Sequence, residues 1–227
     1  MEIFKKVKEI CQGYDLSELA TRFGYPDDTK ELILSDDEAD FRKKYYQTYY
    51  TLLTCKSQKD TRTPFEYGKD IVSMWLIEDF AMFKLQEHGI NVRRNGVDKG
   101  RKILKSGEIN GESDFLAVDG DKKVKIEFVT DFTRFWEKAK KIDFRNKKYE
   151  NIIDNNSILF GLSFDTNNKD YRKYLLLEDI AKYDHIHYDE HPVWKKPANR
   201  VFFNENEVKN LNWDEISDRI KSIVEKR

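Results

Sequence analysis

The stretch SDFLAVDGDKKVKIEFVT, residues 113–130, decides the fold. Its apolar residues recur with a period of two, which is the period of a strand that buries one face. The Asp119-Gly120 step between the two apolar runs is typical of a tight hairpin turn. The sequence therefore predicts a hairpin of two paired strands, residues 113–118 and 123–130.

Short apolar runs on both sides of this hairpin extend the pattern. The predicted strands cover residues 91–94, 157–164 and 174–177. The predicted helices cover residues 132–141, residues 147–153 and a C-terminal segment led by Asn212. Strands that alternate with helices in this way predict an α/β core.

The N-terminal part of the sequence predicts helices instead. Asp15 is placed to cap one of them, and residues 36–57 contain neither Gly nor Pro while an aromatic residue recurs every three or four positions. This spacing predicts one long helix, and we expect its aromatic stripe to lie in the core rather than on a ligand-binding surface. We therefore expect a helical N-terminal extension over residues 1–62 and an α/β core with a C-terminal helix over residues 63–227.

A further long helix is expected to begin at Thr63-Pro64 and to end at His88, because Thr can cap a helix, Pro is tolerated in the first turn and Gly89 supplies a left-handed stop. One face of this helix is apolar, and Glu78 falls on that face. A buried charge without a partner is costly, so Glu78 is expected to meet a cation, a metal ion or a hydrogen-bond donor.

The composition indicates a folded protein. Hydrophobic residues make up 39% of the 227 residues, which argues against intrinsic disorder. No run approaches the roughly 20 apolar residues that cross a bilayer, and the first residues lack the apolar core of a signal peptide. Cys11 and Cys55 form neither a disulfide framework nor a thiolate metal site, so we expect reduced thiols. We expect a cytoplasmic protein without a membrane partner.

The charge is unevenly distributed. The net charge is only −1, yet residues 91–150 contain 16 basic and 11 acidic residues. Within this basic segment, one cluster of cations has only Asp98 for a counter-charge. Its members are Arg93, Arg94, Lys99, Arg101, Lys102 and Lys105. Such a cluster suits contacts with phosphates, and a solvated loop explains it equally well.

Two strand carboxylates carry the strongest chemical signal. Asp114 and Glu127 lie on adjacent strands of the hairpin, so the two can converge on one hard cation that binds oxygen ligands. A divalent cation held in this way can neutralise a phosphate and generate hydroxide. For either carboxylate taken alone, a surface Asp or a salt-bridged Glu is the better explanation.

Together, Glu78 with Gly89 and the segments GESDFLA (residues 111–117) and VKIEFVTD (residues 124–131) resemble the core of the PD-(D/E)XK nuclease superfamily. That superfamily includes type II restriction enzymes, Holliday-junction resolvases and phage exonucleases, and the resemblance covers about residues 64–164. It implies a restriction-endonuclease-like mixed sheet flanked by helices. It also implies the hydrolysis of DNA phosphodiester bonds with a Mg²⁺ ion, or Mn²⁺ as a substitute, bound by Asp114, Glu127 and Glu78.

The sequence departs from the family pattern at one position. The lysine expected two residues after the glutamate is Val129. Lys125 shares a strand face with Glu127 and is our first candidate to replace it, followed by Lys147 and Lys138. If none of these cations reaches the metal, the alternative is a nucleic-acid-binding or assembly protein whose nuclease-like core is inactive.

Residues 133–149 alternate aromatic residues with cations, which is typical of a groove that follows a nucleic-acid backbone. The cations that we expect to contact the backbone are Arg134, Lys141, Arg145 and Lys148. The alternative, favoured for Phe135 and Trp136, is an ordinary amphipathic helix packed on the sheet.

A rival metal site is suggested by His185, His187 and His191, because imidazoles bind zinc or copper. No complete ligand spacing accompanies them, and a surface strand or a DNA contact remains the alternative. DNA is the expected partner, RNA stays open and a homodimer is a possible assembly. Family habit adds the expectation of an origin in a virus or mobile element.

Overall fold

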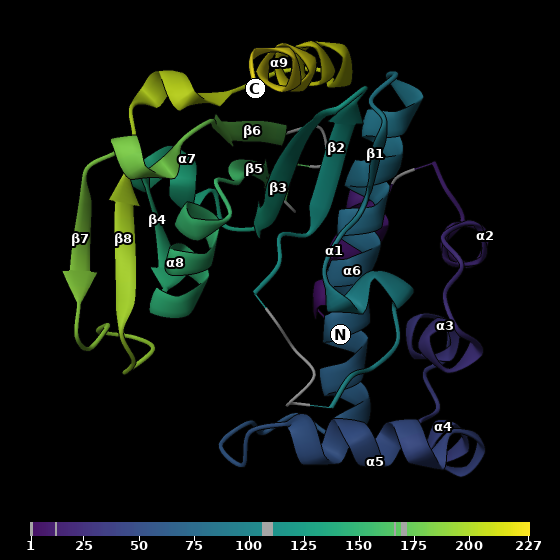
Figure 1. Cartoon of the computed structure of the whole chain (residues 1–227). Helices are drawn as coiled ribbons and strands as arrows, with labels where there is room; N and C mark the ends of the chain where they lie inside the picture. Colours follow the sequence, from purple (N-terminus) through teal and green to yellow (C-terminus); the bar gives the residue numbers. More distant parts are fainter. Residues whose placement is uncertain (1, 12, 106–110, 166, 169–171) are drawn as a thin grey trace. The chain divides into compact units, whose positions relative to one another are not determined.

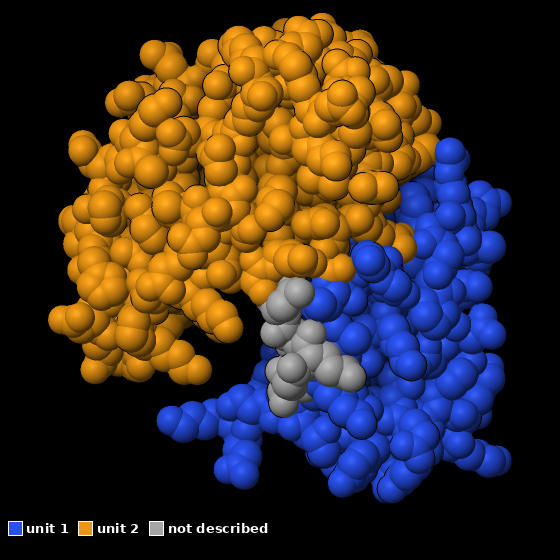
Figure 2. Space-filling view, viewed as in Figure 1, with its two compact units in different colours: residues 1–81, 97–110 blue, residues 82–96, 111–227 orange. Residues whose placement is uncertain are grey.

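The computed structural model describes residues 2–11, 13–105, 111–165, 167–168 and 172–227. The contacts within the chain divide it into two compact units, which Figure 2 shows in different colours. Unit 1 comprises residues 1–81 and 97–110, and unit 2 comprises residues 82–96 and 111–227. This division falls inside the long helix, whereas the predicted division into residues 1–62 and 63–227 falls just before it. No helix within the described ranges combines the length and the apolar composition that a bilayer crossing requires.

Unit 1 contains the predicted N-terminal helical region. Its helices are α1 (Glu2–Ile10), α2 (Leu16–Arg22), α3 (Asp27–Leu34), α4 (Glu38–Lys44), α5 (Tyr46–Cys55) and most of α6 (Pro64–Glu87), with a 3-10 turn η1 (Val97–Gly100). The predicted caps are confirmed at two helices. The Asp15 side chain accepts hydrogen bonds from the first turn of α2. Thr63 and Glu66 form a reciprocal capping box at the start of α6, with N–O distances of 2.8 and 3.2 Å.

The single long helix predicted over residues 36–57 is wrong, because the chain breaks at Tyr45 between α4 and α5. Tyr45 adopts φ −124° and ψ 50°, which is not helical. The break allows Phe41 of α4 and Leu52 of α5 both to be fully buried, and Thr48 then donates a hydrogen bond of 2.5 Å to Asp28. Tertiary packing therefore overrides the uninterrupted helical pattern.

Unit 2 is built on the mixed sheet that the sequence predicts. Its order is β1 (Val92–Arg94), β2 (Phe115–Asp119), β3 (Lys122–Asp131), β5 (Ile158–Phe164), β6 (Arg172–Leu177) and β9 (Val208–Lys209). Only β3 and β5 pair in parallel, and the other neighbours are antiparallel. The predicted hairpin is confirmed, with Phe115 opposite Ile126 and with Gly120 at φ +56° in the turn. Helix α9 (Trp213–Lys226), which Asn212 caps as predicted, packs against β2 and β3 (Figure 1).

The crossover from β3 to β5 differs from its prediction. The expected helix over residues 132–141 is shorter, α7 (Phe135–Ala139), and a strand β4 (Lys141–Arg145) follows it before α8 (Asn146–Asp154). Arg134 and Lys140 take left-handed backbone angles at the two ends of α7, which limits the helix. β4 joins a second sheet in the order β4, β8 (Ala198–Phe202), β7 (His185–Tyr188).

Each face of the main sheet packs on a different set of side chains. On one side lie α7, α8 and the small sheet, whose apolar residues form a core with β5 and β6. Trp136 of α7 approaches Gly161 of β5 so closely that a Cβ there would lie 2.6 Å from the indole. Trp136 is therefore a core residue, as its packing interpretation predicts, whereas Phe135 is 38% exposed. On the other face, aromatic rings of the sheet contact Trp213 of α9.

Candidate active site

Asp114 and Glu127 come together at one end of the β2–β3 hairpin in unit 2. The strand register pairs Phe115 with Ile126, and one further step along it brings Asp114 opposite Glu127. Residues opposite each other in an antiparallel pair point to the same face of the sheet. The Phe128 backbone N–H also donates a hydrogen bond of 2.8 Å to Asp114 Oδ2. The hairpin therefore holds the two predicted carboxylates side by side.

The backbone around Asp114 is fixed by residues that follow β1. The Asn95 N–H donates a hydrogen bond of 2.8 Å to the Asp114 carbonyl oxygen. The Asn95 side-chain amide donates to the Ser113 carbonyl oxygen at 3.1 Å. Ser113 itself is buried. Asp114 precedes the first residue of β2, but the hydrogen bonds from Asn95 hold the backbone at Ser113 and Asp114 in place.

Lys148 brings a cation to this pair. Its ammonium nitrogen lies 2.5 Å from Glu127 Oε1, and its side chain is 43% exposed while that of Glu127 is 10% exposed. Lys148 belongs to the first turns of α8, and Ile152 one turn later is buried in the core and anchors the helix. The resulting site has one buried carboxylate, one half-buried carboxylate and an exposed lysine that reaches the buried carboxylate.

The electrostatics of the site favour a cation. Burial raises the pKa of Glu127, and the nearby Asp114 carboxylate raises it further, whereas Lys148 lowers it; the result is about 7. The cost of keeping two carboxylates close together is what a bound divalent cation relieves. Both side chains also offer hard oxygen atoms, the ligands that Mg²⁺ and Mn²⁺ prefer. The donor set therefore fits such an ion.

A hydrogen-bonded chain connects β3, the C-terminal end of α8 and the segment before Asp114. The Lys125 ammonium donates to Asn155 Oδ1 at 2.6 Å, and the Asn155 amide donates to the Gly111 carbonyl oxygen at 3.2 Å. Gly111 lies directly against Asn151 of α8, because a Cβ built on Gly111 would stand 1.9 Å from Asn151 Nδ2. These contacts position α8, and therefore Lys148, relative to Asp114.

The predicted replacement lysines occupy other places. Lys125 is bonded to Asn155, and Lys138 and Lys147 are exposed on α7 and α8. Sequence reasoning did not place Lys148 among its first candidates for the missing lysine and assigned it to the nucleic-acid backbone. A signal was present, since Lys148 and Asn151 share one face of α8 and Asn155, directly after the helix, continues the same spacing.

Glu78 meets the cation that its apolar position requires. Arg101 Nη1 lies 3.1 Å from Glu78 Oε2 within unit 1. The same guanidinium lies 2.7 Å from Asp79 Oδ1, and Asp79 also accepts a hydrogen bond of 2.6 Å from the Tyr25 hydroxyl. Glu78 belongs to unit 1, whereas Asp114 and Glu127 belong to unit 2. Its role as a third metal ligand stays a prediction.

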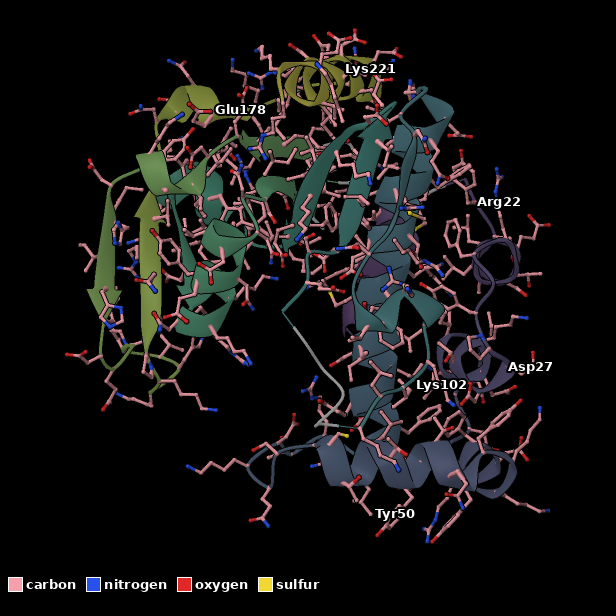
Figure 3. The ribbon with its side chains drawn as sticks, viewed as in Figure 1. Arg22, Asp27, Tyr50, Lys102, Glu178 and Lys221 are labelled. Atoms are coloured by element: carbon pink, nitrogen blue, oxygen red, sulfur yellow. The ribbon has the colours of Figure 1, made fainter. Side chains whose placement is uncertain are left out.

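The basic cluster of residues 93–105 separates into one buried and several accessible cations. Arg101 is only 2% exposed and is bound to Asp79, Glu78 and Asp98, so the structure does not present its guanidinium to a phosphate. Sequence reasoning missed this because two of the counter-charges come from α6. The other members remain candidates for phosphate contacts: Arg93, Lys99, Lys102 and Lys105 are exposed, and Arg94 is half-buried. Figure 3 labels Lys102 among them.

The second group of cations predicted to contact the nucleic-acid backbone lies around α7 and β4. Arg134 is paired with Glu137 at 2.9 Å and with Asp165 at 3.5 Å. The Lys141 ammonium lies 5.7 Å from the centre of the Phe135 ring, and Arg145 is exposed. Their contact with nucleic acid stays a prediction.

The three histidines of the rival metal site do not converge. The His187 ring contacts Asn199 at 3.2 Å, and His185 packs on Tyr149. His191 Nε2 lies 3.1 Å from Asp143, and its Nδ1 accepts hydrogen bonds from the Val193 and Trp194 backbone. Among the residues that the structure describes, no three His, Cys, Asp or Glu side chains are grouped to hold a metal ion. The histidines instead order the small sheet and its loop.

Neither the family models nor the curated proteins with which this sequence was compared match it. The function must therefore be inferred from the arrangement of Asp114, Glu127 and Lys148.

Proposed function

We propose that this protein is a Mg²⁺-dependent nuclease of restriction-endonuclease-like fold. Its active site, formed by Asp114, Glu127 and Lys148, would hydrolyse DNA phosphodiester bonds. One observation carries the proposal: the Lys148 ammonium lies 2.5 Å from Glu127 Oε1, on the carboxylate that the hairpin register brings opposite Asp114. A lysine beside two strand carboxylates is the combination of charges that phosphodiester hydrolysis needs. In this proposal Lys148 replaces the lysine that is absent at position 129.

The packing around Val129 gives a physical reason for the replacement. Val129 shares the strand face of Glu127, but it packs against the hydrophobic core that contains Trp136. Gly161, its partner on β5, is covered by the same indole. A lysine at position 129 would have to bury its ammonium in apolar surroundings, which is costly. A lysine on α8 reaches Glu127 from the solvent side and avoids this cost.

The topology supports the fold assignment. The antiparallel β2–β3 hairpin is followed by a crossover containing α7 and α8 and then by β5, which lies parallel to β3. This arrangement is compatible with the mixed sheet that the resemblance implies, and α8 packs on one of its faces while α9 packs on the other.

Each residue of the site has a distinct task in the proposed reaction. Asp114 and Glu127 would hold the metal ion, which supplies positive charge to the attacked phosphate and generates hydroxide at neutral pH. Lys148 would neutralise the charge that develops on the phosphate oxygens in the transition state. The hydrogen-bonded chain from Lys125 through Asn155 to Gly111 would keep α8 and the Asp114 turn in register.

A cleavage assay tests this proposal. The purified chain is incubated with plasmid DNA, linear duplex DNA, single-stranded DNA and RNA, each with Mg²⁺, with Mn²⁺ and with a chelator. We expect metal-dependent cleavage of at least one DNA substrate and none with the chelator. Binding without cleavage under every metal condition would contradict the proposal and indicate an inactive nuclease-like core.

A further inference from the structure

Unit 1 exposes two tyrosine rings on helix α5. Tyr46 and Tyr50 are 55% and 52% exposed, although large aromatic side chains usually lie in cores or interfaces. They stand one helical turn apart, and their rings are stacked with centroids 6.3 Å apart and planes inclined by 22°. Leu52 of the same helix is fully buried, so α5 already has a core-facing side. Figure 3 labels Tyr50 on this helix.

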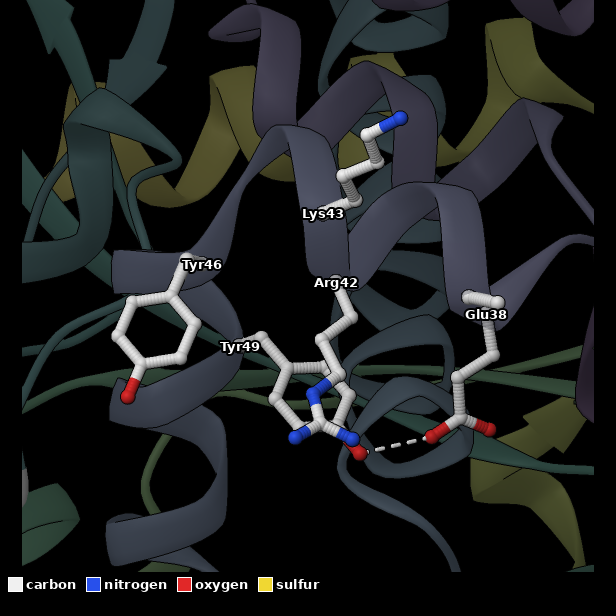
Figure 4. Close-up of a pocket in the computed structure, with 6 residues that line it drawn as sticks. Glu38, Arg42, Lys43, Tyr46 and Tyr49 are labelled. Atoms are coloured by element: carbon white, nitrogen blue, oxygen red, sulfur yellow. Dashed lines mark hydrogen bonds between the residues drawn. The ribbon is translucent and has the colours of Figure 1, made fainter.

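A groove lies beside these rings at the junction of α4 and α5. It encloses about 640 Å³ and is lined by Glu38, Ala39, Arg42, Lys43, Tyr46 and Tyr49. Figure 4 shows the Arg42 guanidinium over the Tyr49 ring, at 5.5 Å from its centre. The Tyr49 hydroxyl in turn donates a hydrogen bond of 2.9 Å to Glu38. The hydrogen bond orients the Tyr49 ring, and the ring in turn supports the guanidinium.

The charge of this segment is one-sided. Residues 41–59 contain Arg42, Lys43, Lys44, Lys56 and Lys59 but no Asp or Glu. This is unusual in a chain whose 42 acidic residues outnumber its 41 basic ones. Arg42 and Lys43 are exposed, and they flank the groove next to Tyr46. The groove lining therefore carries two cations against one carboxylate, that of Glu38, which accepts the hydrogen bond from Tyr49. This net positive charge attracts an anion beside the aromatic rings.

We propose that Arg42, Lys43, Tyr46, Tyr49 and Tyr50, here called the tyrosine surface, bind single-stranded nucleic acid. Bases would stack on the exposed rings of Tyr46 and Tyr50, and Arg42 and Lys43 would contact the phosphates that flank those bases. A single strand fits this surface better than a duplex, because the bases of a duplex are stacked on each other and present no ring face. It also fits better than an acidic peptide, which has carboxylates for the cations but no general need for stacked rings.

This site shares no residue with the proposed nuclease centre, since all its residues belong to unit 1. Its existence does not depend on whether unit 2 cleaves nucleic acid. Binding can therefore be measured with a chelator present, which leaves the outcome unaffected by the cleavage reaction.

The test uses the full chain and a fluorescent oligothymidylate of about 16 nucleotides, the upper end of typical single-strand site sizes. Anisotropy is recorded in chelator for the wild type, for Tyr46→Ala/Tyr50→Ala and for Tyr46→Phe/Tyr50→Phe. We expect the alanine pair to weaken binding at least about tenfold and the phenylalanine pair to bind like the wild type, because only the ring is needed for stacking. Both tyrosines are exposed, and circular dichroism should show that all variants keep the wild-type helix content.

The role of the cations is tested by the salt dependence of the same binding. Lys43→Ala should make the slope of log affinity against log salt shallower by about 0.7, the value for one phosphate contact with a single strand. Lys5→Ala, which removes an exposed lysine from α1, should leave the slope unchanged. The proposal is overturned if the alanine pair binds the single strand like the wild type, if it weakens duplex binding as much as single-strand binding, or if polyglutamate competes as well as unlabelled oligothymidylate.

Discussion

The ammonium group of Lys148 lies 2.5 Å from Oε1 of Glu127, although the first residue belongs to helix α8 and the second to strand β3. The topology explains the contact. Helix α8 leads into β5, and β5 pairs in parallel with β3 so that Leu159 lies next to Glu127. Helix α8 therefore lies next to the end of the hairpin at which Asp114 and Glu127 meet.

The first prediction concerns this lysine. Lys148→Ala should slow metal-dependent cleavage by about 10² to 10³, because it removes a preorganised charge next to the reacting phosphate. The free energy of unfolding of this variant should change little, since the Lys148 side chain is 43% exposed. Single-turnover rates measure the effect, and Lys147→Ala, an exposed neighbour on the same helix, serves as the matched control. Equal rates for Lys148→Ala and the wild type would remove Lys148 from the site.

A second prediction follows from the position of Val129. In the Lys148→Ala background, Val129→Lys should recover part of the lost cleavage, because alternate residues of a strand share a face and a lysine side chain spans the roughly 7 Å to Glu127. Val129→Lys alone should lower activity, since it adds a second cation and disturbs the core that Val129 contacts. A double variant no more active than Lys148→Ala would show that the cation must come from α8.

The third prediction concerns the contact between Gly111 and α8. Gly111→Ala should displace the Asn151 side chain and disturb the contact that positions α8, because the new Cβ would lie 1.9 Å from Asn151 Nδ2 and 2.3 Å from its Cγ. A displacement of about 1 Å can reduce catalysis by about 10². Adding Asn151→Ala removes the obstructing atoms and should restore cleavage. Gly100→Ala is the control, since no atom lies within 4 Å of its built Cβ.

Sequence patterns predict the hairpin, the caps of α2, α6 and α9 and the Asp114–Glu127 pair, because these features depend on residues close together in the chain. They do not reveal β4 and β8, whose pairing joins Asp143 to Arg200. The place of Lys148 depends on the same crossover. Local patterns contain no information about which distant segment a helix or strand will meet, so these parts required the structure.

The buried Arg101 illustrates the same limit for charge. A basic cluster in sequence resembles a phosphate-binding surface, but here the folded chain brings Asp79, itself fully buried, to the guanidinium. We predict that Arg101→Met lowers the free energy of unfolding by about 3–5 kcal/mol, because it leaves a buried carboxylate without its counter-charge. Lys102→Met replaces an exposed side chain and should alter the free energy of unfolding by less than about 0.5 kcal/mol. Urea denaturation measures both, and equal effects would contradict this distinction.

In nucleic-acid binding we expect the exposed Lys102, rather than the buried Arg101, to contribute a phosphate contact. Lys102→Ala is expected to make the salt dependence of duplex binding shallower by about 0.9, the value for one lost phosphate contact. A slope equal to that of the wild type would assign Lys102 to a solvated loop.

The pKa of Glu127 predicts how stability depends on pH. Burial and Asp114 raise this pKa from 4.5 to about 7, so between these values the folded protein keeps a proton that the unfolded chain releases. The stabilisation is complete below pH 4.5 and is lost as the pH rises through 7, with a total change of at most about 3 kcal/mol. Urea denaturation in chelator should show this decline in the wild type and a flatter profile in Glu127→Gln. Parallel profiles would contradict the raised pKa.

The carboxylate pair is tested most directly by the cleavage of labelled DNA with Mg²⁺ by the wild type, Asp114→Asn, Glu127→Gln and Asp119→Asn. Asp119 is an exposed carboxylate at the end of β2 and serves as the control. We predict that the wild type and Asp119→Asn cleave at similar rates, whereas the other two variants lose cleavage by several orders of magnitude because each loses a metal ligand. Cleavage by Asp114→Asn and Glu127→Gln at the wild-type rate would contradict the proposed active site.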